Sequence, residues 1–267
     1  MGLAVCATPI GNLDDVTLRV LAELRAADTV LCENTRRTAI LLERHGIRAR
    51  SLLSYHRHNE ARRIAELLPR LAAGERFALV SDAGLPAIND PGTRLVDAVL
   101  DAGAAVTVLP GASAIETALV ASGLAAEQYR FLGYLPRGTR QLEALWKDLA
   151  AWPHASVAFE SPKRLPTSLA SLAAVDGDRR LAVCRELTKR FEEVVRGSAQ
   201  ELAARFQEPP KGEITLVIGA RATADDDNAG LQAVLELVAS GTPRGVAAAV
   251  VARLTGKPRN ALYRSSL

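Results

Sequence analysis

The sequence predicts an α/β protein built from two α/β domains and a small helical tail, and three observations support this. From residue 3 to about residue 115, short apolar runs alternate with amphipathic helical patterns, as in a parallel sheet covered by helices. Beyond residue 115 some connections are as short as hairpins, which is typical of a mixed sheet. After residue 221 the strand pattern stops and short helical patterns follow. We therefore predict a mostly parallel, Rossmann-like domain over residues 1–112, a mixed-sheet domain over 113–221, and a linker with a helical tail over 222–267.

The prediction of a parallel first domain depends mainly on the stretch from residue 78 to residue 123. Two apolar strands, 77–80 and 105–109, end in loops of small residues, 81–84 and 110–113, and a helix over 91–102 connects them. We expect both strands to be buried and both loops to lie at neighbouring strand ends. Ligands of open parallel sheets bind outside the carboxyl ends of the strands, so these loops predict a binding cleft. The alternative is that their glycines are ordinary turn residues.

The remaining elements follow in order. In the first domain we predict strands at 3–7, 29–33 and 51–55. A helix follows each strand: one over 16–26 that begins at Asp14 and Asp15, one that runs to His45, and one that runs through Leu71. No G-x-G-x-x-G follows the first strand, so a Rossmann dinucleotide site is not expected. In the second domain we predict strands at 130–134, 156–160, 181–185, 191–197 and 212–219. We predict helices over 141–151, from Ser161 onward, and from the cap Ser198 to Phe206.

The tail contains helical patterns over 231–239 and 246–254 and a short one near Leu262. Two short helices around a basic turn resemble a helix-turn-helix in outline, and a helical cap folded onto the body is the alternative.

Composition limits the class of protein. The 267 residues are 48% apolar and 24% charged, as in soluble globular proteins. The chain has no apolar run of about 18 residues and no basic leader segment, so neither a membrane span nor a signal peptide is expected. Three widely spaced cysteines favour the reducing cytoplasm. A net charge of +3 permits nucleic-acid binding without demonstrating it.

Two similar pairs of charged residues follow strands of the second domain. Glu160 and Lys163 are three residues apart, and so are Glu186 and Lys189. Each pair offers a base and a cation near one cleft, which suits activation of a weakly acidic hydroxyl. The four residues are therefore our catalytic candidates, and solvated or helix-capping roles are the alternative.

Other chemistries have weaker support. His56 and His58 lack a matching ligand pair, so no metal is expected. Cys32 lies in an apolar strand, where a thiol is usually inert. Ser81 is not in a nucleophile elbow, and no Walker loop is present.

Nine short motifs, in order, resemble the tetrapyrrole-methylase superfamily, and the match is closest to its branch of small-subunit ribosomal RNA methyltransferases. The resemblance covers about residues 3–220, and the tail resembles that branch as well. The motifs are residues 8–13, 33–36, 54–60, 81–84, 110–114, 159–164, 185–189 and 211–214, together with the tail.

The resemblance implies a class III S-adenosylmethionine-dependent methyltransferase with a cofactor cleft between its two α/β domains. It implies 2′-O-ribose methylation of a cytidine in the decoding region of 16S ribosomal RNA, by direct transfer to the hydroxyl oxygen. Carried onto this chain, it implies that small-residue loops hold the cofactor, through Pro9, Gly11, Ser81, Asp82, Ala83, Gly84, Leu85, Ser113, Ala114, Glu213 and Ile214.

The resemblance also implies partners. The substrate is ribosomal RNA or the assembled small subunit, and a homodimer is typical of the superfamily. We expect the RNA to be bound by basic residues of the cleft rim and by the segment 257–264; the rim residues are Arg36, Arg37, Arg57, Arg137, Arg140 and Arg164. RNA whose bases are splayed out is the natural target, because the 2′-oxygen must enter a pocket.

The chain departs from the superfamily pattern at four positions. Asn34 stands where an Asp is usual, Leu85 where Thr is common, Ala112 where Pro is common, and Lys163 where His is expected. Asn34 removes a carboxylate from the cleft, so that position is not proposed as a base.

Two other functions stay open from sequence. One is a small-molecule methyltransferase acting on a tetrapyrrole, although aromatic residues make up only 4% of the chain and a porphyrinoid pocket is more apolar and aromatic. The other is a non-catalytic RNA-binding or cofactor-sensing protein.

Overall fold

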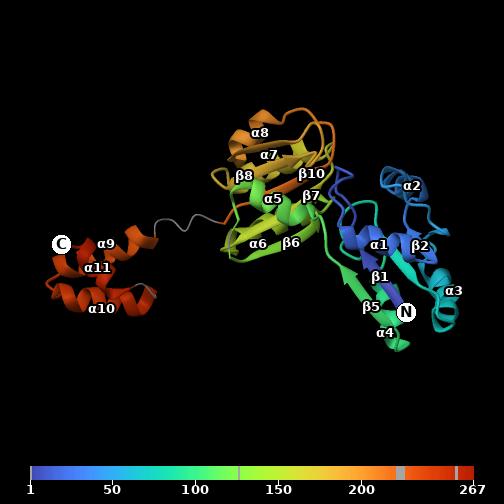
Figure 1. Cartoon of the computed structure of the whole chain (residues 1–267). Helices are drawn as coiled ribbons and strands as arrows, with labels where there is room; N and C mark the ends of the chain where they lie inside the picture. Colours follow the sequence, from blue (N-terminus) through green and yellow to red (C-terminus); the bar gives the residue numbers. More distant parts are fainter. Residues whose placement is uncertain (1, 126, 221–225, 256–257) are drawn as a thin grey trace. The chain divides into compact units, whose positions relative to one another are not determined.

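The computed structural model describes residues 2–125, 127–220, 226–255 and 258–267. The chain divides into two compact units, one of residues 1–149 and 154–220 and the other of residues 150–153 and 221–267. The larger unit holds two five-stranded sheets with their helices, and the described part of the smaller unit is mainly helical (Figure 1). The α/β class, the two sheets and the C-terminal helices are as predicted. The boundaries at residues 112 and 221 stay a prediction.

The first sheet is entirely parallel, with strand order β3-β2-β4-β1-β5. Alternate residues of β1 point to opposite faces, as in any strand. Ala4 and Cys6 pack with α1 and α2, whereas Leu3 and Val5 pack with α3 and α4. The element bounds are β1 (Gly2–Cys6), α1 (Leu18–Ala26), β2 (Thr29–Cys32), α2 (Thr35–Arg44), β3 (Leu52–Ser54), α3 (Glu60–Ala72), β4 (Phe77–Val80), α4 (Thr93–Asp101) and β5 (Ala105–Leu109).

The start of α1 differs from the prediction. Asp14 and Asp15 do not cap the helix; Thr17 does, because its extended backbone places Oγ1 where it accepts a hydrogen bond from the Val20 N–H at 3.2 Å. Asp14 instead forms an ion pair with Arg44 of α2, with 2.7 Å between Oδ2 and the guanidinium.

The position of β5 also differs from the prediction. β1 lies between β4 and β5, because Leu3 pairs in register with Phe77 on one side and with Val106 on the other. The loops after β4 and β5 are therefore separated by the loop after β1, rather than adjacent. β5 is an edge strand and is not fully buried, since Val108 is 52% exposed. The result is three small-residue loops at the same edge of the sheet.

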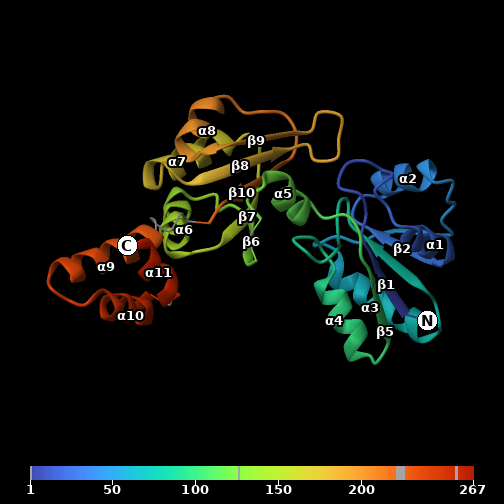
Figure 2. The same ribbon diagram turned by 60° about the vertical axis from the view of Figure 1, so that its left-hand side comes forward.

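The second sheet is mixed, as predicted, with strand order β6-β7-β10-β8-β9. β6 and β7 are parallel, and the other pairs are antiparallel. Helix α5 packs on one face of the sheet (Figure 2). The bounds are α5 (Ala114–Ser122), β6 (Tyr129–Tyr134), α6 (Thr139–Ala151), β7 (Ala155–Glu160), α7 (Leu165–Val175), β8 (Arg180–Arg185), β9 (Glu193–Ser198), α8 (Ala199–Arg205) and β10 (Ile214–Ile218).

Two polar contacts fix helices of the second sheet. The predicted Ser198 cap is confirmed as a full capping box: Ser198 Oγ accepts from the Glu201 N–H at 3.1 Å, and the Glu201 carboxylate accepts from the Ser198 N–H at 2.7 Å. Trp146 of α6 is buried, and its Nε1 donates to Ser171 Oγ of α7 at 3.1 Å. A buried indole needs such a partner for its N–H.

The smaller unit contains α9 (Asp226–Ala239), α10 (Arg244–Thr255) and α11 (Arg259–Ser265). Its own small apolar core consists of Val234, Ala247, Ala248, Val251 and Leu262. Residues 222–225 of the predicted linker and residues 256–257 of the predicted basic turn lie outside the described residues. From residue 240 to the end, the sequence has five basic residues and no acidic one: Arg244, Arg253, Lys257, Arg259 and Arg264.

None of the helices in the described ranges combines the length and the apolar character that crossing a bilayer requires.

Candidate active site

The loops after β1, β4 and β5 are joined by backbone hydrogen bonds. Thr8 and Gly84 bond each other in both directions, with N–O distances of 2.8 and 3.0 Å. Thr8 Oγ1 donates to the Ser81 carbonyl at 3.0 Å, and Ser81 Oγ donates to the Gly84 carbonyl at 3.0 Å. The Ala7 N–H donates to the Leu109 carbonyl at 3.1 Å, so the third loop is held as well. These bonds make a rigid floor of small residues at the strand ends.

A cavity of about 800 Å³ lies over this floor and is walled by both sheets of the larger unit. Its walls come from the segment 82–90 after β4, from the segment 110–116 that leads from β5 into α5, and from second-sheet residues that include Phe131, Tyr134 and Phe159. The volume falls in the range of ligand sites, about 300–1,000 Å³. The predicted cofactor residues that line it are Asp82, Ala83, Gly84, Leu85, Ser113, Ala114, Glu213 and Ile214.

A smaller cavity of about 270 Å³ adjoins the larger one. The remaining predicted cofactor residues, Pro9, Gly11 and Ser81, line this one, together with Lys189. The two cavities share part of their lining: Ile10, Arg37, Asp82, Ala83 and Glu213.

Acidic side chains line the larger cavity, and one of them was missed from the sequence. Asp90 follows the loop 81–84, where an Asp before Pro-Gly reads as an ordinary turn residue. Burial raises the pKa of Asp90 to about 6, and the negative charges of Glu33 and Asp82 add to the shift. One oxygen of Asp82, Oδ1, is buried and accepts no hydrogen bond within the described residues. A cavity lined in this way suits a cation.

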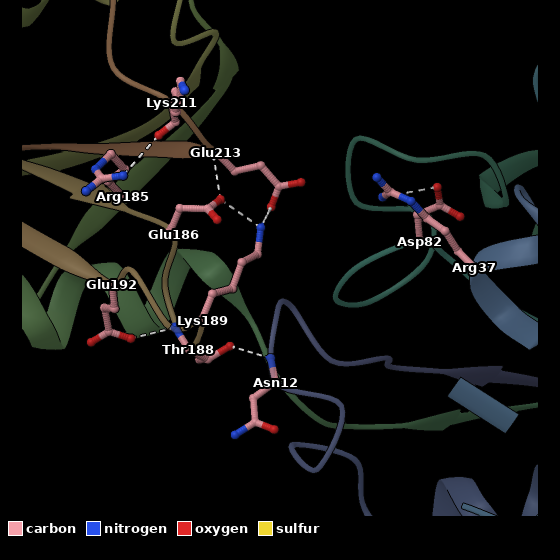
Figure 3. Close-up of polar contacts among 10 residues, drawn as sticks. All are labelled: Asn12, Arg37, Asp82, Arg185, Glu186, Thr188, Lys189, Glu192, Lys211 and Glu213. Atoms are coloured by element: carbon pink, nitrogen blue, oxygen red, sulfur yellow. Dashed lines mark hydrogen bonds and ion pairs between the residues drawn. The ribbon is translucent and has the colours of Figure 1, made fainter. Parts of the chain in front are cut away.

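Lys189 is the centre of a charged cluster at the second sheet (Figure 3). Its Nζ lies 2.9 Å from Glu186 Oε1 and 2.9 Å from Glu213 Oε2. Burial disfavours the charged amine, but the hydrogen bonds to the two carboxylates outweigh this and raise the pKa of Lys189. The hydrogen bond from Lys189 also lowers the pKa of Glu186, and the hydrogen bond from the Glu213 backbone N–H adds a smaller effect in the same direction. At neutral pH Lys189 is therefore an ammonium and Glu186 a carboxylate.

The loop that carries this cluster has a strained backbone. Glu186 and Thr188 are non-glycine residues with φ of 52° and 64°, which costs about 1–3 kcal/mol each. A Cβ on Gly212 would lie 2.4 Å from Glu186 Cγ, so only glycine fits there. Strain of this kind persists only where surrounding contacts impose it.

Gly11 and Asn12, in the loop after β1, provide such contacts. The Asn12 N–H donates to Thr188 Oγ1 at 2.9 Å (Figure 3). A Cβ on Gly11 would lie 2.7 Å from the Leu187 carbonyl oxygen and 2.5 Å from Lys189 Cγ. The loop after β1 thus touches the backbone of the Lys189 loop, a contact between distant segments that no sequence pattern signalled.

Glu160 and Lys163, the second predicted pair, lie in different surroundings. Glu160 is buried, and its carboxylate accepts hydrogen bonds from Arg164 at 2.9 Å, from Ser168 Oγ at 2.5 Å and from the Ser161 N–H at 2.6 Å. It lines the larger cavity, but these bonds are those of a structural anchor. Lys163 is exposed and lines neither cavity.

The six predicted RNA-contacting arginines separate into three groups. Arg37 lines both cavities and faces Asp82, with 3.4 Å between the charged atoms. Arg36, Arg137 and Arg140 are exposed and line neither cavity.

The other two arginines hold loops. Arg57 donates to the Asn89 carbonyl at 2.9 Å, which supports the cavity wall that carries Asp90. Arg164 donates to the Leu135 carbonyl at 2.7 Å as well as to Glu160, so its guanidinium is used inside the second domain.

The motif at residues 54–60 supports the same wall. Glu60 is buried, and its Oε1 accepts hydrogen bonds from Tyr55 Oη at 2.7 Å and from the Gly92 N–H at 3.2 Å. These bonds fix the chain where it enters α4, two residues after Asp90. Asn34, which replaces an expected Asp, caps α2: its Oδ1 accepts from the Arg36 N–H at 3.1 Å.

Thiol and metal chemistry find no support among the described residues. All three cysteines are buried, and burial raises the pKa of Cys32 and that of Cys6, the latter to about 12. No group of three or more His, Cys, Asp or Glu side chains that could hold a metal occurs in the described ranges.

Comparison with protein families gives two matches. Residues 2–203 match the family described as tetrapyrrole (corrin/porphyrin) methylases, and residues 224–267 match the RsmI C-terminal HTH domain.

Curated proteins and solved structures agree with these matches. The chain is 42% identical to ribosomal RNA small subunit methyltransferase I of Mesorhizobium japonicum, over 99% of this chain and 91% of that protein. It is 44% identical to the protein of the same name from Streptococcus pyogenes serotype M1, over 84% of this chain and 78% of that protein. The fold is similar to that of a uroporphyrin-III C-methyltransferase from Thermus thermophilus, solved with S-adenosyl homocysteine, at a TM-score of 0.58 and 18% identity over 82% of this chain and 97% of that one.

Proposed function

Because the chain belongs to the tetrapyrrole methylase family and, within it, to the ribosomal RNA small subunit methyltransferase I family, we propose that it methylates the 2′-oxygen of a decoding-region cytidine in 16S ribosomal RNA. Methylation of small-subunit ribosomal RNA with S-adenosylmethionine follows from the family. The position of the methyl group and the identity of the nucleotide are our proposal. The observation that supports it most is 42% identity over 99% of the chain.

The larger cavity fits S-adenosylmethionine. The cofactor carries a sulfonium and an ammonium, and the carboxylates of Asp82, Asp90 and Glu213 line the cavity. Oδ1 of Asp82, buried without a partner among the described residues, is an acceptor that a donor of the cofactor or of the substrate would satisfy. When bound, the cofactor would supply an electrophilic methyl group to the 2′-oxygen, and the hydroxyl proton would pass to solvent water.

The Lys189 cluster supplies charge rather than a strong base. Glu186 is held ionised by its hydrogen bond to Lys189, and a carboxylate with a lowered pKa is a weak proton acceptor. Lys189 is protonated at neutral pH and lines the smaller cavity. We assign to it the stabilisation of negative charge that develops on the 2′-oxygen. Much of the acceleration then comes from positioning of the hydroxyl.

Partners and location are also part of the proposal. β5 is the edge strand of the first sheet, and we propose that it takes part in a homodimer, because edge strands pair readily. The run of basic residues after residue 240 suits contact with RNA phosphates. An enzyme that acts on the ribosome would work in the cytoplasm.

Methyl transfer to isolated small ribosomal subunits that lack the modification tests the function. We expect labelled methyl groups to enter the RNA, and we expect nuclease mapping to find 2′-O-methylcytidine in the decoding region. A methylated base, or a product elsewhere in the RNA, would refute the proposed target. Transfer only to a tetrapyrrole, or cofactor binding with no transfer to any acceptor, would support one of the two alternatives.

Substitution of Asp90 tests the cofactor cavity. Asp90→Asn is expected to weaken S-adenosylmethionine binding about tenfold or more, the scale of one lost charged interaction. Since the pKa of Asp90 is about 6 and the cofactor is a cation, wild-type affinity is expected to rise with pH through about 6 and then level off. Titration calorimetry between pH 5 and 8 measures both effects.

Asp101→Asn is the matched control for this prediction, because Asp101 is an exposed acid at the end of α4 that lines neither cavity. Its affinity and pH profile should equal those of the wild type. A pH-dependent rise that persists in Asp90→Asn would contradict the assignment.

A further inference from the structure

We propose that the smaller cavity is the subsite for the acceptor nucleotide, and that Arg37 binds the phosphate of this nucleotide. The inference rests on the proposed function, since it specifies where RNA enters the active site. The smaller cavity is thus assigned to a ribonucleotide within an RNA strand, and Arg37 to direct contact with that substrate.

The arrangement of the two cavities is the first argument. In a direct transfer the reacting atoms approach to roughly 3–3.5 Å, so the acceptor must bind in space that communicates with the cofactor cavity. The smaller cavity meets this requirement, because the two share the side chains of Ile10, Arg37 and Asp82. Its volume of about 270 Å³ lies below the roughly 300–1,000 Å³ of sites for drug-sized ligands. The size of the smaller cavity therefore suits a single nucleotide better than a second molecule of S-adenosylmethionine.

The charges are the second argument. Within the described residues, the cations that line the smaller cavity are Arg37 and Lys189. Lys189 is held by two carboxylates at 2.9 Å each. Arg37 is 58% exposed, and its pair with Asp82 is long, 3.4 Å, so most of its five N–H donors remain available. A guanidinium of this kind is well suited to bind phosphate.

The rim is the third argument. Ile40 lies one turn after Arg36 and Arg37 on α2, lines the smaller cavity but not the larger, and is 55% exposed. An exposed aliphatic side chain beside a guanidinium offers an apolar contact to the ribose or the base. Figure 3 shows Arg37 and Asp82 on the first-sheet side and Lys189 on the second-sheet side, so a nucleotide in this cavity would touch both domains.

Three variants test the inference in the methyl-transfer assay with unmodified small subunits, with cofactor affinity measured separately by calorimetry. Arg37→Ala removes the phosphate ligand and should raise KM for the subunit at least tenfold. Ile40→Trp fills the smaller cavity from its rim and should raise KM by a similar factor. Ile40→Trp should leave the Kd for S-adenosylmethionine within threefold of wild type, because Ile40 does not line the larger cavity. Arg37 lines both cavities, so Arg37→Ala should change this Kd by a clearly smaller factor than it changes KM. Arg19→Ala is the control, since Arg19 is an exposed arginine of α1 that lines neither cavity and is not among the predicted RNA-contacting residues.

The readouts separate the possible failures. Equal KM values for Arg37→Ala, Arg19→Ala and wild type would overturn the inference. The proposed function would still stand in that case, because the wild type transfers the methyl group. A cofactor Kd that rises as much as KM in Arg37→Ala would assign Arg37 to the cofactor cavity and would also overturn it. Absence of transfer by the wild type to any RNA would refute the proposed function, and the acceptor subsite with it. Circular dichroism and melting temperature confirm that each variant is folded.

Discussion

Lys189→Ala is expected to lower kcat/KM for methyl transfer by about 10²–10³, the usual cost of one electrostatic contact to a developing oxyanion. The amine lies between Glu186 and Glu213, with 2.9 Å to each carboxylate. Without it, two carboxylates would face each other where we propose that the 2′-oxygen binds, and the positive charge that we assign to stabilising the alkoxide would be gone. The loss should appear mainly in kcat, measured with saturating small subunits and cofactor.

Lys163→Ala provides the control for Lys189→Ala. Both lysines follow a glutamate at the same spacing, but Lys163 is exposed and lines neither cavity, so its variant should keep activity within about twofold, the range of ordinary surface substitutions. Comparable losses in the two variants would remove the special role of Lys189. A Lys189→Ala protein with full kcat but weakened cofactor binding would show that the cluster shapes the cavity and does not act on the oxygen.

Gly11→Ala is expected to reduce kcat/KM by 100-fold or more, in the range found when catalytic groups shift by about 1 Å. The new Cβ would lie 2.7 Å from the Leu187 carbonyl oxygen, and a backbone atom cannot rotate away as a side chain can. The Lys189 loop must therefore move, and the bond from the Asn12 N–H to Thr188 must lengthen or break. Steady-state kinetics and a crystal structure of the variant would check both effects.

Gly138→Ala is the control for this glycine. A Cβ there would have its nearest contact at 3.4 Å, to a flexible glutamine side chain, so activity should stay close to wild type. Full activity of Gly11→Ala would mean that the two domains adjust their approach easily, and the strained Lys189 loop would then need another explanation.

The secondary structure could be predicted because each element has a local signature. The helices of the first sheet carry apolar residues at helical spacing, and the strands are short apolar runs. Strand order could not be predicted, because it depends on pairing between distant segments: nothing within β1 specifies that it inserts between β4 and β5. For the same reason β5 reads as a buried strand, although its place at the edge leaves Val108 half exposed.

The residues of the site could likewise be predicted where they follow a local pattern, and could not where they depend on contacts between distant segments. Small-residue loops after strands are a local pattern, and their residues do line the two cavities. The two Glu-Lys pairs have identical spacing, yet Glu160 is bound by Arg164 and Ser168 whereas Glu186 is bound by Lys189. Which pair lies beside the smaller cavity depends on the contact of Gly11 with the Lys189 loop, across more than 170 residues of sequence. Asp90 escaped notice because its surroundings, and not its neighbours in sequence, raise its pKa.

The burial of the three thiols has a practical consequence for spectroscopy. Cys6, Cys32 and Cys184 are buried, and each has a raised pKa, so their thiolate fraction at neutral pH is low and alkylating dyes react with them slowly. A cysteine introduced at the exposed position of Ile40 would react far faster than these three. A fluorophore could thus be attached at the rim of the smaller cavity in an otherwise native chain, and stopped-flow fluorescence would then follow the arrival and departure of RNA in real time.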